Sequence, residues 1–175
     1  GRPFNVTLET STDGSTWSTY TFGTDITLAN VWDKVYSRNT SETPTWFSTS
    51  WTAVYYFSMT WSIAASWDVN YLLCKNSTDT LQNNYCFNSL FWSCTSLTRP
   101  PRLPATTLGA YCYQSMFSSC TNLEILPELP ATTLPNYCYQ YMFATCSKIK
   151  LSETQAWEYQ TEYRIPITWT WSAWT

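Results

Sequence analysis

The chain writes one unit three times in the same register: YCFNSLFWSCTSLTRPPRLPATTL over residues 85–108, YCYQSMFSSCTNLEILPELPATTL over residues 111–134, and YCYQYMFATCSKI over residues 137–149. Equivalent positions lie 26 residues apart. A fixed period of about 20–50 residues is typical of stacked repeats, because one unit cannot bury its apolar face alone. The sequence therefore predicts a repeat stack over residues 85–149. Its buried ladders are expected at Cys86, Cys94, Cys112, Cys120, Cys138, Cys146, Phe91, Phe117 and Phe143.

The spacing inside a unit assigns each part of it a conformation. Cys112, Met116 and Phe117 lie at i, i+4 and i+5, which predicts one apolar face of a short helical segment. The run from Leu123 to Ile125 is typical of a short strand. Proline residues follow it and indicate a bend before the next unit, since proline fixes φ and removes a backbone donor.

These motifs resemble the BspA-type leucine-rich repeat of surface proteins from gut and oral bacteria. The resemblance rests on Y-C-Y-x-x-M-F-x-x-C-x-x-L followed by L-P-A-T-T-L, and it covers about half of the chain directly. Residues before the repeats also resemble the β-rich region that precedes such repeats in that family. The resemblance implies an α/β solenoid whose short strands line up in a parallel ladder.

The rest of the chain is predicted to form three further segments. Residues 3–73 alternate in polarity and carry an Asp13-Gly14 hairpin signal, which predicts a small all-β, sandwich-like domain. The polar residues 74–84 are expected to connect it to the repeats, and the two parts to pack together, because a terminal repeat needs its open face covered. Residues 150–175 lose the period and are interpreted as a truncated C-terminal segment.

Composition excludes several classes of partner. With 44% hydrophobic residues the chain can bury a core, and with a net charge of −3 and nine Lys and Arg it has no basic stripe for nucleic acid. Its apolar runs are far shorter than the roughly 18 residues that a membrane span needs. We expect no nucleic-acid partner and no membrane span in this fragment.

Six of the seven cysteines belong to the repeats, and only Cys74 stands apart. We interpret the six as buried free thiols, since free cysteine is among the most buried residue types. Disulfides are the alternative, because they would suit an extracellular protein, but sequence alone cannot give their pairing. A zinc site is disfavoured because Cys-x7-Cys lacks the short spacing of structural sites. No metal or cofactor is expected.

The chain has none of the usual signs of an enzyme. It contains no His, the most frequent general base. Its carboxylates are dispersed, and Glu124 and Glu128 are interpreted as solvated surface charges rather than a glycosidase pair. There is no glycine-rich phosphate loop. We therefore predict that the protein is not an enzyme and has no catalytic residues.

The resemblance implies an extracellular or cell-surface protein that mediates adhesion or protein–protein binding to a protein or glycoprotein on host or neighbouring cells. The alternative is a structural spacer or fibre module, of an envelope or a phage, that displays other domains and binds nothing itself. Positions that vary between repeats are the candidate binding surface: Arg99, Arg102, Gln114, Ser115, Ile125, Glu128, Gln140 and Tyr141.

The tryptophans are anomalous. The chain has 11 Trp and 4 Gly, whereas average usage of about 7% Gly would give about 12 in this length. Several Trp occupy turn positions, where a chain needs φ > 0 or a tight bend. Where this sequence resembles the family, those positions usually hold Gly. We hypothesise that most of the Trp are glycines read from UGA codons, and UGG in the gene at Trp32, Trp61, Trp67 and Trp157 would refute this. An aromatic carbohydrate-binding surface and ordinary core tryptophans are the alternatives.

Overall fold

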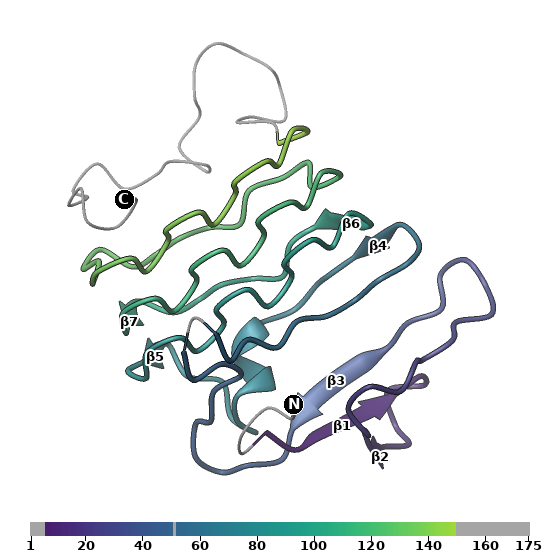
Figure 1. The fold of residues 1–175 in the computed structure, drawn as a ribbon. Helices are drawn as coiled ribbons and strands as arrows, with labels where there is room; N and C mark the ends of the chain where they lie inside the picture. Colours follow the sequence, from purple (N-terminus) through teal and green to yellow (C-terminus); the bar gives the residue numbers. More distant parts are fainter. Residues whose placement is uncertain (1–5, 51, 150–175) are drawn as a thin grey trace.

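The computed structural model describes residues 6–50 and 52–149, and over these residues the fold is mostly β, in small sheets (Figure 1). The sheet drawn in purple and blue in Figure 1 contains β1 (Leu8–Ser11), β2 (Ser18–Thr19) and β3 (Tyr36–Asn39), in the order β2-β1-β3 and antiparallel throughout. The hairpin predicted at Asp13-Gly14 is confirmed, because β1 pairs with β2 across it. No second antiparallel sheet faces this one within the described residues, so a sandwich is not shown.

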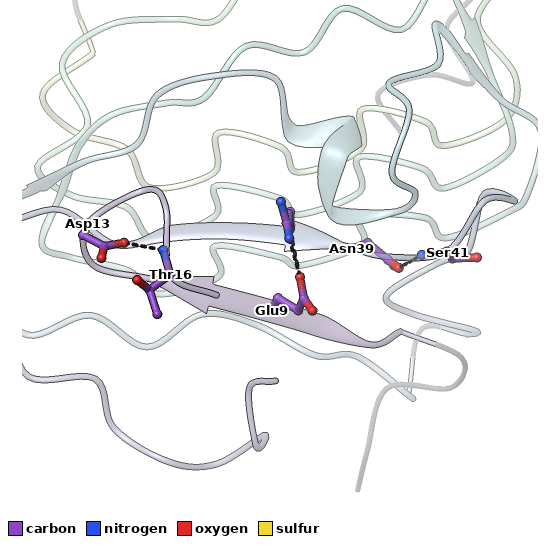
Figure 2. Close-up of polar contacts among 6 residues, drawn as sticks. Glu9, Asp13, Thr16, Asn39 and Ser41 are labelled. Atoms are coloured by element: carbon purple, nitrogen blue, oxygen red, sulfur yellow. Dashed lines mark hydrogen bonds and ion pairs between the residues drawn. The ribbon is translucent and has the colours of Figure 1, made fainter. Parts of the chain in front are cut away.

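Local hydrogen bonds fix the ends of this sheet. The Asp13 carboxylate accepts from the amides of Ser15 and Thr16, both at 2.7 Å, and these bonds hold its pKa well below the usual range. Figure 2 shows this turn beside the Glu9 carboxylate, which accepts from the Arg38 guanidinium at 2.8 Å. The turn connects β1 to β2, and the ion pair connects β1 to β3.

The end of β3 is tied to the chain that follows it by one buried side chain. The Asn39 amide is fully buried and donates to Thr45 Oγ1 at 2.9 Å and to the carbonyls of Leu72 and Leu73, each at 3.1 Å. Its carbonyl oxygen accepts from the Ser41 amide (Figure 2). Leu72 ends the 3-10 helix η1 (Val69–Leu72), so this one side chain joins the sheet to η1.

Several residues between 47 and 50 and between 52 and 65 lie directly against the first repeat. The Phe47 amide donates to the Cys86 carbonyl at 3.0 Å, and the Phe57 amide donates to the Leu90 carbonyl at 2.8 Å. Further along, β4 (Ile63–Ala64) pairs in parallel with β6 (Leu97–Arg99). One hydrophobic core extends from Val6 to Met142 and so includes both the N-terminal region and the repeats.

The repeats contain no helical segment among the described residues, and the expected helix is replaced by a run of consecutive turns. We call residues 85–94, 111–120 and 137–146 the turn runs. Every fourth residue of each run has positive φ, a conformation that an α-helix cannot contain. These residues are Tyr85, Ser89, Ser93, Tyr111, Ser115, Ser119, Tyr137, Tyr141 and Thr145.

Hydrogen bonds explain how such a backbone is satisfied. In the first run the odd-numbered residues donate across to the second run, as the Phe87 amide does to the Cys112 carbonyl at 2.9 Å. The even-numbered residues from Asn88 onward donate within the run, as Leu90 does to the Phe87 carbonyl at 3.2 Å. The second run bonds to the third in the same way, for example from Tyr113 to Cys138 at 2.9 Å. Each run therefore needs its neighbour.

Rings repeat along the stack with the same register. The ring centroids of Phe91 and Phe117 lie 5.5 Å apart, and those of Phe117 and Phe143 lie 5.7 Å apart, with the rings nearly parallel. Phe91 and Phe117 are buried, whereas Phe143, on the last described unit, is partly buried. Phe57 continues this stack on the N-terminal side, 5.5 Å from Phe91.

The chain returns from each turn run through a second, straighter layer, visible in Figure 1 as the smoother part of each unit. We call residues 97–108 and 123–134 the return segments. β6 begins the first of them, and β7 (Thr107–Leu108) ends it, pairing in parallel with β5 (Thr80–Leu81). At Gly109 a Cβ atom would lie 2.5 Å from the Asn83 carbonyl oxygen, so only glycine allows this close approach.

Three of the tryptophans that we interpret as glycines are exposed, and two of them have a positive φ. Trp32 and Trp67 have φ of 83° and 77°, and they are 90% and 73% exposed. Trp61 is 84% exposed. None of the three belongs to the hydrophobic core, whereas Trp46 packs against it. The same hypothesis for Trp157, Trp169, Trp171 and Trp174 concerns positions outside the described residues.

Candidate binding surface

The eight candidate residues fall into two groups on different layers of the stack. Four lie in the turn runs and four in the return segments, so the structure does not gather all eight at one point. The turn-run group is Gln114, Ser115, Gln140 and Tyr141; the return-segment group is Arg99, Arg102, Ile125 and Glu128.

Amide side chains form a continuous row across the turn runs. Asn88 Nδ2 donates to Gln114 Oε1 at 2.7 Å, and Gln114 Nε2 donates to Gln140 Oε1 at 2.6 Å. Each residue occupies the same position of its unit, 26 residues from the next. The three side chains are held in fixed rotamers by one another. Gln114 and Gln140 were candidates from the sequence, whereas Asn88, the equivalent residue of the first unit, was not.

A row of stacked tyrosines runs beside the amides. Tyr85 and Tyr111 have ring centroids 4.6 Å apart, and Tyr111 and Tyr137 have centroids 5.0 Å apart. All three are half-buried. Desolvation raises the pKa of Tyr111, and the phenols of Tyr85 and Tyr137 on either side raise it further. The invariant 26-residue period of Tyr was the signal in the sequence for this row.

The residue that follows each amide of the row has a positive φ. Ser115 and Tyr141 have φ of 53° and 55°, and the same position in the first run is Ser89. Tyr141 is 59% exposed, which makes it the most exposed of the large side chains on the turn runs. Ser119 and Thr145 join adjacent units through their hydroxyls, 3.0 Å apart.

The return segments present charges of both signs. Arg99 ends β6 and is exposed. Arg102 is also exposed, and its backbone forms an isolated parallel β-bridge with that of Asp68. Glu124 and Glu128 are exposed, and Ile125 is half-buried between them. Neither carboxylate forms an ion pair among the described residues. This layer is the charged surface of the repeats.

Comparisons with protein-family models, with curated proteins and with solved structures found no match to this chain. The assignment to a family therefore rests on the motif resemblance alone.

The six cysteines of the turn runs are free thiols. Cys94, Cys120 and Cys146 each donate to a phenylalanine carbonyl of the preceding layer, at 2.7, 3.0 and 3.0 Å. Burial raises the pKa of Cys120 to about 12 and that of Cys94 to about 11. These thiols are therefore neutral hydrogen-bond donors that link adjacent layers.

The other row of cysteines has a shared acceptor. Cys86 and Cys112 both donate to the Asn83 carbonyl, at 3.0 and 3.2 Å. The interaction between the two thiols raises the pKa of Cys86 and lowers that of Cys112. Both side chains are buried, so solvent does not reach the pair.

The described residues bring together no group of three or more His, Cys, Asp or Glu side chains that could hold a metal ion. One open hollow lies beside the β1–β2 turn, between apolar Ile26 and Val35 and a wall of hydroxyl groups. Its single carboxylate, Asp13, is already bonded to backbone amides. Over the same residues, no helix has the length and hydropathy to cross a membrane.

Proposed function

We propose that this chain is an extracellular surface protein of the leucine-rich repeat type, and that its stacked units form a binding surface for a protein or glycoprotein on host or neighbouring cells. The cell-surface location and the adhesive role come from the resemblance to BspA-type repeats. The solenoid architecture belongs to the same proposal.

One observation supports the proposal above the others: side chains at equivalent positions stand in register across three units. The tyrosine row, the amide row and the Ser119–Thr145 pair each continue from one unit to the next. A surface whose side chains are already fixed loses little conformational entropy on binding, which favours affinity. Recognition is therefore a use to which this architecture is well suited.

Direct binding to immobilised matrix glycoproteins tests the proposal. The probe is the whole chain, shown to be folded by a cooperative thermal melt. We expect saturable binding that is weakened by Ser118→Lys on the turn runs or by Glu128→Lys on the return segments, since each places a new charge on one layer. Whichever substitution acts also tells which layer makes the contact.

The rival function, a spacer that displays other domains, predicts a different result. The interlayer hydrogen bonds make the stack stiff along its length, which is what a spacer needs. A folded sample that binds no matrix glycoprotein, with neither substitution having an effect, would favour the spacer and contradict the adhesive role.

A further inference from the structure

The three turn runs share one property: none of their residues is charged. The chain has nine Lys and Arg and twelve Asp and Glu, yet residues 85–94, 111–120 and 137–146 contain none of them. In the first two units the charged residues lie instead on the return segments. A partner of the turn runs would gain little from carrying charge, and we expect its binding to depend weakly on salt.

The outward side chains of the turn runs offer hydrogen bonds of both kinds. A side-chain amide has two N–H donors, and the row uses one from Asn88 and one from Gln114. Asn88 is buried, so its second N–H does not face a ligand. Gln114 and Gln140 are partly exposed, and the second N–H of Gln114 and the N–H groups of Gln140 remain for a ligand, as do hydroxyl groups such as those of Ser115 and Thr145. These groups are held at regular intervals by their neighbours in the adjacent units.

The aromatic part of this surface is of a particular type. The rings of Tyr85, Tyr111 and Tyr137 cover one another's faces, so they present edges and hydroxyls. Tyr141 stands apart from that row and is 59% exposed, which leaves a ring face open to a ligand. An amphipathic ring of this type suits a ligand that is apolar on one side and polar at its rim.

The dimensions also restrict the partner. Hydrogen-bonded chains lie about 4.7–4.9 Å apart, so three turn runs make a strip that is narrow along the stack. A standard protein interface takes about 800 Å² from each partner and has an apolar centre. The strip has no exposed Leu, Ile, Met or Phe, and its two exposed large rings, Trp92 and Tyr141, belong to the first and the third run, so they do not form such a centre.

We propose that the turn runs bind an uncharged carbohydrate chain, with Tyr141 against a sugar ring and the side-chain amides of Gln114 and Gln140 bonded to its hydroxyls. A pyranose ring has C–H groups on its faces and hydroxyls around its rim, which matches the exposed ring and the fixed amides. This inference rests on the proposed binding function and specifies the chemistry of the partner. It concerns the turn runs and not the exposed tryptophans of the N-terminal region.

The first test uses defined oligosaccharides. Neutral hexaoses of glucose and of N-acetylglucosamine, with different linkages, are titrated into the folded protein and followed by calorimetry. We expect at least one to bind, with an affinity unchanged between about 0.05 and 0.5 M NaCl. The proposal is wrong if none of them binds, or if only sulfated or sialylated oligomers bind and salt weakens them.

The second test uses substitutions that the repeat itself makes safe. Tyr141→Ser installs the residue that units one and two carry at this position, so the fold is expected to persist. We expect it to weaken binding at least about tenfold. Glu124→Gln on the return segment is the matched control and should leave the affinity unchanged. Equal affinities for both variants and the original protein would overturn the assignment to the turn runs.

A third comparison separates this inference from the proposed function. A matrix glycoprotein is offered before and after its glycans are removed enzymatically. Binding that is lost on deglycosylation supports a carbohydrate partner. Binding that persists unchanged refutes the carbohydrate partner but leaves protein adhesion standing. No binding of either form, together with no binding of the hexaoses, refutes both.

Discussion

Replacing Trp32, Trp61 and Trp67 together by Gly should leave the protein about as stable as it is, or make it more stable. Trp32 and Trp67 have φ of 83° and 77°, where a residue with a side chain is strained and glycine is not. Each site should release about 1–2 kcal/mol of strain. The three side chains are 90%, 84% and 73% exposed, so little buried area is lost with them.

Glycine has an opposing effect through the unfolded state. Each new glycine gives the unfolded chain more freedom, which costs about 0.5–1 kcal/mol. The two effects nearly cancel, and we expect the free energy of unfolding to change by between about −1 and +2.5 kcal/mol. A buried tryptophan behaves differently, because its truncation costs about 3–5 kcal/mol.

A thermal melt of the triple variant distinguishes these outcomes. In a chain of this length 1 kcal/mol shifts Tm by about 2–4 °C, so the expected shift is small or upward. Trp17→Gly is the matched control. It should lower Tm, since the Trp17 ring is half-buried and lies 3.9 Å from the Arg38 guanidinium. A drop in Tm of about 10 °C or more in the triple variant would show that these tryptophans are structural and would refute the reasoning.

Four further predictions concern the core and the cysteines. Gly109→Ala should lower Tm by several degrees, because its Cβ would lie 2.5 Å from the Asn83 carbonyl oxygen; an unchanged melt would contradict this close approach. Asn39→Ala should lower the free energy of unfolding in urea by about 1–3 kcal/mol, since it leaves the Leu72 carbonyl without its donor and the Ser41 amide without its acceptor, whereas the Leu73 carbonyl keeps its bonds from Thr45. Dithiothreitol should leave Tm unchanged, as the cysteines are free thiols; a fall in Tm would reveal disulfides. Stability should decline between about pH 9 and 12, because burial raises the pKa of Cys120 from 9.0 to about 12 and the unfolded state loses this proton first.

The period of 26 residues could be read from the sequence, and with it the residues that meet across the stack. Tyr85, Tyr111 and Tyr137 recur at one position, and a periodic chain that buries one face places equivalent residues side by side. The Asp13-Gly14 hairpin was equally readable, because its signal is local. Both inferences depend on spacing alone and need no knowledge of the backbone between the repeated positions.

The conformation of the turn runs was not readable in the same way. Cys86, Leu90 and Cys94 lie four residues apart, a spacing that puts side chains on one face of a helix. A succession of turns with positive φ at every fourth residue also has a four-residue repeat, and it buries the same positions. The sequence pattern is common to both, so it predicted a helix where the structure has turns. Hydrogen bonds to the neighbouring run decide between them, since the odd-numbered amides need acceptors 25 residues away.

The candidate surface was also predicted from the sequence only in part. Variation between repeats identified Gln114, Gln140 and Tyr141 from the sequence, but it also selected Arg99 and Glu128, which lie on the other layer. Only the tertiary structure separates an uncharged layer of turn runs from a charged layer of return segments. A residue belongs to one layer or the other only after its unit has folded into two layers. Residue spacing determined which positions stack on one another. The folding of each unit around its core determined which of these positions lie on the same face of the stack.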